Sequence, residues 1–226
     1  MRALWRASLA LLGKELRIEL RTGEVVLMTG LFATLVTVLT SLSFYLDTRT
    51  ALRVAPGVLW IAVTFAGVLA MGRSWARERE HDVFRGLLMT PMPRAALYLS
   101  KVASSLIFLA VVELVLVLQV AVFFNVELFA VALPLLSLLG LGSVGFVATG
   151  NLFAALSVRT RARDMMLSVI VFPVVAPALL CGVVATRELF AGAPMSDIAA
   201  WMQILGAFDL AFLAAGIALF DVLIQD

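Results

Sequence analysis

Six long runs of apolar residues divide the chain, and they constrain its fold more than any other feature. They cover residues 25–46, 54–72, 102–124, 135–156, 165–185 and 201–224. A helix needs roughly 20 apolar residues to cross a bilayer, and each run approaches or exceeds that length. The runs lack the period-two alternation of a membrane β-barrel, so they favour helices. The sequence therefore predicts an all-α membrane protein with six transmembrane helices, built as one transmembrane domain over residues 1–226.

The composition supports this prediction and excludes several kinds of site. Of the 226 residues, 63% are hydrophobic and 14% are charged, whereas a soluble domain carries about 25% charged residues. The single cysteine, Cys181, excludes an internal disulfide and a cysteine-based metal cluster. The single histidine, His81, excludes a zinc site built on several histidines. We therefore expect no metal site in this chain.

The distribution of positive charge predicts how the helices are oriented. Fourteen of the 17 Lys and Arg residues lie in segment 1–24, loop 73–101 and loop 158–164. Positive residues concentrate on the cytoplasmic side of membrane proteins. The count predicts that the N-terminus and the C-terminus both lie in the cytoplasm. Because these basic residues are spread over one segment and two loops at the membrane surface, they suit contact with anionic lipid headgroups. They predict no nucleic-acid partner.

Segment 1–24 has a helical pattern of its own. Trp5 and five leucines recur near helical spacing, with Arg and Lys residues between them. Such a pattern is typical of an amphipathic helix that lies at the membrane interface. An unstructured basic tail is the alternative.

The segment between the second and third apolar runs is dense in charge. Seven of the thirteen residues from Arg73 to Arg85 are charged. Apolar residues three and four positions apart predict a cytoplasmic helix over 74–89, which ends before Thr90-Pro91 because residues preceding proline avoid the helical region. Such a helix suits docking of a soluble partner, while a solvated loop that only anchors topology is the alternative. The candidate docking residues are Arg77, Glu78, Arg79, Glu80, Asp82, Phe84, Leu87 and Leu88.

Among the polar residues inside the predicted spans, Glu113, Gln119 and Asp209 are the candidates for a function. A charge near the bilayer centre is expensive, so such residues usually face protein or a water-filled cavity. For Glu113 two interpretations stay open: a role in transport, conformational change or a subunit contact, or a hydrogen-bonded packing role. Asp209 lies nearer the start of its run, which favours packing. Ser143 and Glu113 are the only pair that suggests an intramembrane enzyme, and the sequence does not place them together.

Residues 140–145 fit the pattern GxGxxG, which is also found in dinucleotide sites. Here the pattern lies inside an apolar run with no preceding strand, so we interpret Gly140, Gly142 and Gly145 as helix-packing residues, with a subunit interface as one possible location. Pro173 and Pro177 predict a kink or local break in the fifth span.

Several blocks of sequence resemble a known family. The blocks ARERE (76–80), GLL (86–88), TP (90–91) and YLSK (98–101) resemble the cytoplasmic segment of ABC-2-type permeases. The blocks KELRIELR (14–21), APGVLW (55–60), FAG (65–67) and AFD (207–209) narrow this resemblance to the CcmB family, also named haem exporter protein B. These proteins are membrane subunits of the CcmABCD complex of cytochrome c maturation. The resemblance covers essentially the whole chain.

The resemblance implies a function and a set of partners. It implies a homodimer in the bacterial inner membrane, with a CcmA-like ATPase on a coupling helix that includes residues 77–88. CcmC and CcmD would bind alongside, and CcmE would bind transiently. ATP hydrolysis would drive haem export or release of the haem-loaded chaperone CcmE. An ABC-2 permease for another lipid, glycan or drug is the alternative, and a scaffold without ATP coupling is another.

Other features of the sequence limit what the chain would do without partner subunits. The chain has no GxxxxGK[ST] motif, so ATP would be bound and hydrolysed by a partner, and we expect a non-catalytic subunit. His81-Asp82-Val83 departs from the commoner ABC-2 pattern. Because His81 lies on the predicted cytoplasmic side, we expect no cofactor and no stable haem site on this chain alone.

Overall fold

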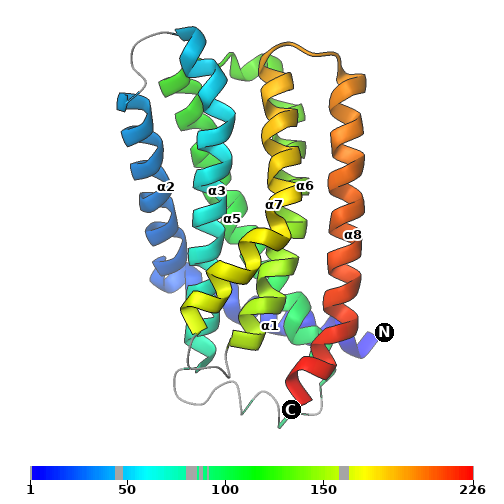
Figure 1. Cartoon of the computed structure of the whole chain (residues 1–226). Coiled ribbons are helices and arrows are strands. Elements are labelled where there is room, and N and C mark those ends of the chain that lie inside the picture. Colours follow the sequence, from blue (N-terminus) through cyan, green and yellow to red (C-terminus); the bar gives the residue numbers. More distant parts are fainter. Residues whose placement is uncertain are drawn as a thin grey trace.

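In a computed structural model, the chain forms a bundle of long helices (Figure 1). The structure describes residues 2–43, 48–79, 86, 89–90, 92–157 and 163–225. The helices are α1 (Arg2–Thr22), α2 (Glu24–Ser43), α3 (Thr48–Arg79), α5 (Arg94–Phe124), α6 (Leu128–Ser157), α7 (Arg163–Phe190) and α8 (Met195–Gln225). The described part of the chain contains no strand, which confirms the predicted all-α fold.

Six of the helices, α2, α3 and α5 to α8, are long and apolar enough to cross a membrane, which confirms the predicted number of spans. Their ends differ from the apolar runs. Helix α3 begins at Thr48 and continues to Arg79, and α8 begins at Met195 rather than near residue 201. Hydropathy marks only the part of a helix that suits lipid, while the helix itself continues into polar sequence at both ends.

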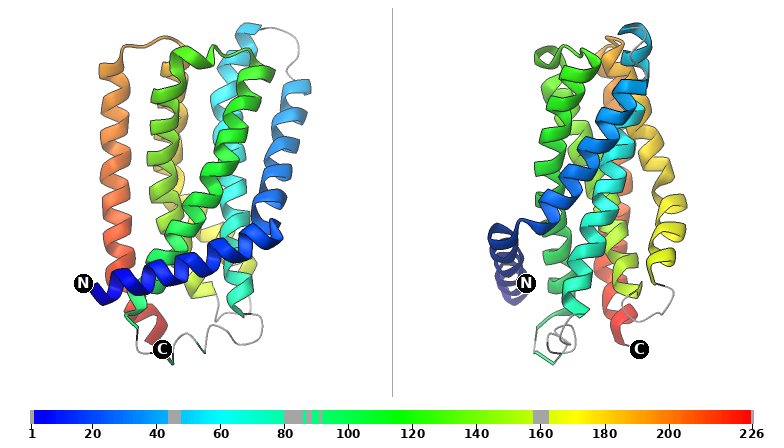
Figure 2. Two further views of the ribbon diagram at one scale, coloured as in Figure 1. Left: turned by 180° about the vertical axis from the view of Figure 1, so that it is seen from behind. Right: turned by 90° about the vertical axis from the view of Figure 1, so that its left-hand side faces the viewer.

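Helix α1 lies crosswise at one end of the bundle, beside the ends of the spanning helices (Figure 2). We call this end the α1 end; the end of α8 lies there too. Gly23, with a left-handed φ of 61°, turns the chain from α1 into α2. Glu15 and Glu19 on α1 are buried, whereas Trp5 and Leu9 are exposed. The segment 2–22 is therefore a helix with an acidic inner face, and the alternative of an unstructured tail is wrong.

Large aromatic side chains pack against glycines in the core. The rings of Trp60 and Phe146 lie where a Cβ added at Gly142 or Gly67 would overlap them. A glycine without a side chain lets the neighbouring helix and its aromatic ring approach closely. The core between α3, α6 and α7 therefore depends on these glycines.

The three glycines of the GxGxxG pattern differ in their surroundings. Gly142 contacts Trp60 of α3, and Gly145 contacts Phe208 and Asp209 of α8. Gly140 is exposed, and an added Cβ there would meet nothing within 4 Å. Of these three glycines, Gly142 and Gly145 serve close packing within the chain and Gly140 does not, since a residue two positions away on a helix points to a different side.

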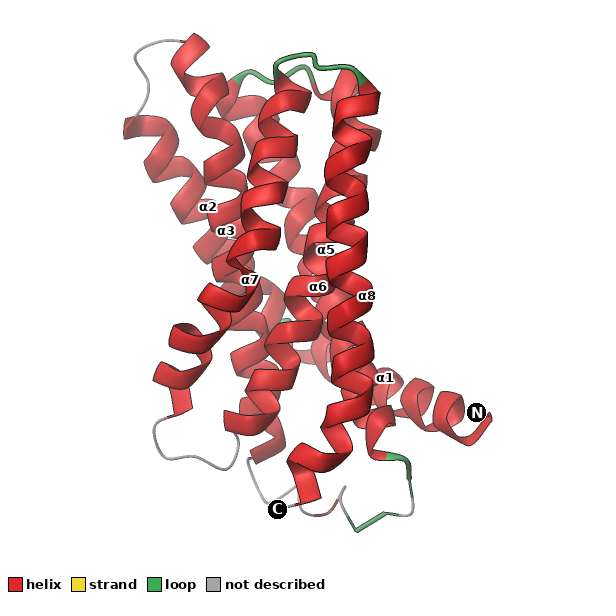
Figure 3. Ribbon diagram, turned by 45° about the vertical axis from the view of Figure 1, so that its right-hand side comes forward, coloured by secondary structure: helices red, strands yellow, loops and turns green. Residues whose placement is uncertain are grey.

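Helix α7 bends part-way along its length, and its half nearer the α1 end leans away from the bundle (Figures 1 and 3). Pro173 and Pro177 lie inside this helix. Proline lacks an N–H group and its ring clashes with the preceding turn, so it bends helices.

Candidate functional site

A cluster of paired charges lies where α1, the start of α2, α3 and α5 meet, at the α1 end of the bundle. We call it the charge cluster. Its members are Lys14, Glu15, Glu19, Glu24, Arg77, Glu78 and Lys101. Most partners come from different helices, so the cluster forms only when these four helices pack together.

Lys101 of α5 lies at the centre of the charge cluster and is fully buried. Its Nζ atom is 3.0 Å from Glu15 Oε1 and 2.9 Å from Glu78 Oε1. It also donates a hydrogen bond to the carbonyl oxygen of Ser74, at 3.1 Å, and lies 5.6 Å from the centroid of the Trp75 ring. A buried ammonium is tolerated only when its charge and its three donors have partners. The position of Lys101 therefore depends on α1 and α3 together.

Glu78, near the end of α3, joins Lys101 to α1. The carboxylate is 1% exposed and accepts a hydrogen bond from Lys14 Nζ at 2.7 Å. Burial alone would lower the pKa of Lys14, but the hydrogen bond and charge of Glu78, and then the charge of Glu15, outweigh it and raise that pKa above its usual value. Lys14 therefore stays charged at neutral pH.

Arg77 holds the turn between α1 and α2. Its Nη2 atom is 3.1 Å from Glu19 Oε2 and 3.2 Å from Glu24 Oε2. The other oxygen of Glu19 accepts the backbone N–H of Val26 at 2.8 Å. An acidic side chain at this position satisfies a free N–H in the first turn of α2. Glu19 thus links the end of α3 to the start of the first spanning helix.

The intramembrane residues form separate contacts. Glu113 of α5 accepts a hydrogen bond from Ser143 of α6, and both side chains are buried. The structure thus brings together a pair that the sequence could not place. Both residues lie among packed helices at 6% and 2% exposure, which favours a packing contact over an intramembrane enzyme. Gln119 donates to Thr34 of α2 at 2.8 Å.

Asp209 lies in the middle of α8, because that helix begins at Met195. The expectation that Asp209 lies nearer the start of its span is therefore wrong. Its carboxyl group is 5% exposed and lies against Gly145 of α6, where an added Cβ would be 2.5 Å from Oδ1. Glu113 and Asp209 thus contact α6 from two neighbouring helices, at Ser143 and Gly145.

Known proteins are similar to this chain over a region that includes both the charge cluster and the intramembrane contacts. The family model described as CcmB protein matches residues 6–221. The chain belongs to the CcmB family. Similar proteins named heme exporter protein B occur in Bradyrhizobium diazoefficiens, at 30% identity over 92% of both chains, and in Paracoccus denitrificans, at 31% identity over 91% of this chain and 92% of the relative. A third, from Pseudomonas aeruginosa, is 25% identical over 92% of this chain and 93% of the relative.

The match confirms the resemblance to the CcmB family that the sequence blocks indicated. Every residue of the charge cluster, and Glu113, Ser143 and Asp209, fall within the matched residues 6–221. Both sets of contacts therefore belong to the part of the chain that is shared with the CcmB family.

The candidate docking residues of this CcmB-family chain divide into two groups. Arg77 and Glu78 belong to the end of α3 and turn into the charge cluster. Residues 74–79 therefore continue the second spanning helix, and a separate helix does not begin at residue 74. Helix α3 continues past residue 74 because Trp75 and Glu78 pack inward. The side chain of Arg79 and the residues Glu80, Asp82, Phe84, Leu87 and Leu88 lie outside the described part.

The sequence alone did not indicate that Lys14, Glu15, Glu19 and Lys101 form one site. A signal was present in α1, where Glu15 and Glu19 are four residues apart and so share one face of a helix. A line of carboxylates on an interfacial helix needs positive partners on the bundle. Lys101, at the start of an apolar run, is the residue that this pattern could have indicated as a partner.

Proposed function

We propose that this chain is the membrane subunit of an ATP-driven transporter that acts on haem during cytochrome c maturation. The observation that carries the proposal is the similarity to proteins named heme exporter protein B along nearly the full length of both chains. Six helices able to span a membrane support a permease role. Since the sequence has no phosphate-binding motif for ATP, a separate CcmA-like ATPase would supply the energy.

The charge cluster supports a route for coupling. In the proposal the ATPase docks on residues 77–88, which include the end of α3 and the segment after it. Lys101 and Glu78 tie the end of α3 to α5, and Lys14 and Arg77 tie it to α1 and α2. Displacing the end of α3 would therefore move these helices together. Glu78 Oε2 and Arg77 Nη1 are buried without a hydrogen-bond partner among the described residues, which is consistent with a site that changes contacts during the cycle.

The further parts of the proposal concern partners and location. Two copies of the chain would form the membrane core in the bacterial inner membrane, with both termini in the cytoplasm. CcmC and CcmD would bind beside this core, and CcmE would bind transiently to receive or release haem. Haem would be held with a partner subunit, because the only histidine is His81 in the predicted cytoplasmic segment.

Complementation of a bacterial strain that lacks its own CcmB-family subunit tests the function. The expected result is restored haem-stained cytochrome c, together with copurification of the CcmA-like ATPase and CcmC. No maturation despite normal membrane insertion would contradict the role in cytochrome c maturation. Transport of a lipid, glycan or drug without CcmC or CcmE would favour the general ABC-2 alternative.

The coupling route is tested by Glu78→Ala and Glu80→Ala in the purified complex. The expected result is weaker ATPase binding and reduced ATP turnover. Unchanged binding and turnover in both variants would show that this segment is not the docking site.

A further inference from the structure

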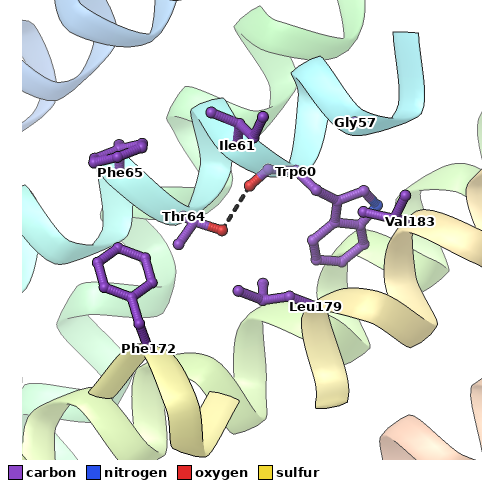
Figure 4. Close-up of a pocket in the computed structure, with 8 residues that line it drawn as sticks. All are labelled: Gly57, Trp60, Ile61, Thr64, Phe65, Phe172, Leu179 and Val183. Atoms are coloured by element: carbon purple, nitrogen blue, oxygen red, sulfur yellow. Dashed lines mark hydrogen bonds between the residues drawn. The ribbon is translucent and has the colours of Figure 1, made fainter. Parts of the chain in front are cut away.

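A second feature lies away from the charge cluster, in a pocket between α3 and α7. The pocket has a volume of about 240 Å³. Figure 4 shows that α3 and α7 supply opposite walls. The lining residues are Gly57, Trp60, Ile61, Thr64, Phe65, Phe172, Leu179 and Val183.

The lining offers no free hydrogen-bonding side chain. The Trp60 indole N–H donates to Thr186 Oγ1 at 2.9 Å, beyond the pocket wall. The Thr64 hydroxyl donates to the backbone oxygen of Trp60 at 2.6 Å (Figure 4). The remaining lining side chains are apolar. An occupant with polar groups would lose its hydrogen bonds to water without gaining others, so the pocket suits a hydrocarbon.

The position of the pocket decides which hydrocarbon can reach it. All lining residues fall inside the two spanning segments, Thr50–Glu78 and Val171–Phe190. Ile61 and Phe65 are 52% and 43% exposed on the outside of the bundle. In a spanning helix such a surface faces lipid, so acyl chains are at the entrance of the pocket. An α-helix rises about 1.5 Å per residue, so Gly57 lies about 14 Å along α3 from its first residue, Thr48.

The walls explain why the pocket stays open. The ring of Phe65 contacts Phe32 of α2 and Phe172 of α7, each with centroids 5.9 Å apart, which closes one end. Phe172 precedes Pro173, where α7 can bend away from α3. Gly57 supplies no side chain, and a Cβ added there would meet nothing within 4 Å.

We propose that this pocket binds one acyl chain of a membrane phospholipid. Its volume exceeds the ~150 Å³ of a dry apolar cavity that accepts benzene. It is smaller than the roughly 300–1,000 Å³ of pockets for drug-sized ligands, which argues against a whole tetrapyrrole. The bound chain fills the space between α3 and the kinked α7. This site is separate from the proposed haem function and from the charge cluster.

Photolabelling tests the proposal with a phosphatidylethanolamine that carries a diazirine on its acyl chain. The full chain is reconstituted in vesicles of phosphatidylethanolamine and phosphatidylglycerol, irradiated, and mapped by peptide mass spectrometry. Leu179, which is partly buried, should be labelled as strongly as the lipid-facing Leu118, which is 54% exposed. Much weaker labelling of Leu179 than of Leu118 would overturn the proposal.

Gly57→Leu fills the pocket from a position that has room for the side chain. It should lower labelling of Leu179 about tenfold, the effect of losing about two buried methylene contacts, and leave Leu118 unchanged. Gly140→Leu is the matched control, because Gly140 is also open and lies on another helix.

Ile61→Trp, at the exposed mouth, is a second blocking variant if Gly57→Leu does not fold. Undiminished labelling of Leu179 in a folded blocking variant would overturn the proposal. Loss of Leu179 labelling in the wild-type chain, when a second copy or a partner subunit is assembled with it, would also overturn the proposal. A protein side chain would then occupy the pocket.

Discussion

Lys101 of α5 and Glu78 of α3 form an ion pair of 2.9 Å in which both side chains are almost fully buried. Their partners on α1, Glu15 and Lys14, complete a set of two positive and two negative groups. Breaking a buried pair by removing one partner leaves an uncompensated charge, which is more costly than removing a surface pair. Replacing Lys101 should therefore destabilise this end of the bundle more than replacing Lys14.

Lys101→Met should strongly destabilise the protein. It leaves the buried Glu15 and Glu78 without their central cation, at a cost of about 3–5 kcal/mol. Thermal unfolding of the purified protein in detergent measures the loss. Lys14→Met is the control, because the Lys14 side chain is 35% exposed and Glu78 keeps Lys101 as partner. Equal losses in the two variants would show that Lys101 is not the centre of the cluster.

Arg77→Gln should loosen α1 from the bundle. The variant removes the contacts to Glu19 and Glu24 that hold the turn between α1 and α2. Limited trypsin digestion of the purified protein should cut faster after Arg17 and Arg21, which lie on α1. Arg73→Gln is the matched control, since Arg73 has a half-exposed side chain and pairs with Glu24 at 3.6 Å. Similar cleavage rates in Arg77→Gln and wild type would contradict the role of Arg77.

The spans could be predicted from the sequence because lipid demands long apolar helices whatever their neighbours are. Their ends could not, as the continuation of α3 to Arg79 and the start of α8 at Met195 show. The end of α3 is fixed by packing against α1 and α5. That packing is a property of the folded chain and leaves no mark in local hydropathy.

The site was predicted only in part, for a related reason. A local density of charge marks Arg77 and Glu78, but their ion-pair partners are 23 to 64 positions away along the chain. Glu113 and Ser143 were likewise named without a way to bring them together. Pairing across helices depends on how the helices rotate and pack, and this cannot be read from the local pattern of a single sequence. The cytoplasmic location of the termini and the roles of the docking residues stay predictions.

Glu113→Gln should lower cytochrome maturation without releasing the ATPase. Glutamine keeps the size of the side chain and a hydrogen bond to Ser143, so the fold should survive while any function of the carboxyl group is lost. Haem staining of cytochrome c and copurification of the ATPase measure the two effects. Full maturation in this variant would assign Glu113 to packing alone.

Ser143→Ala tests the structural side of the same contact. It leaves the buried carboxyl group of Glu113 without its hydrogen-bond donor, which should cost about 1–3 kcal/mol of stability. Ser137→Ala on the same helix is the control, because the Ser137 hydroxyl donates only to the backbone of its own helix. A Ser143→Ala variant as stable as Ser137→Ala would show that the contact contributes little.

Gly142→Ala and Gly140→Ala should have opposite effects, although the two glycines are two residues apart. A methyl group at Gly142 overlaps the ring of Trp60. That ring cannot move aside easily, because it is hydrogen-bonded to Thr186 and lies against Gly182 on α7. Overpacking of this kind costs about 1–3 kcal/mol. At Gly140 the added methyl group meets nothing, so alanine should raise stability by up to about 1 kcal/mol through its higher helix propensity. Thermal unfolding of both variants in detergent decides the matter, and equal destabilisation would mean that Gly140 is packed against another part of the protein.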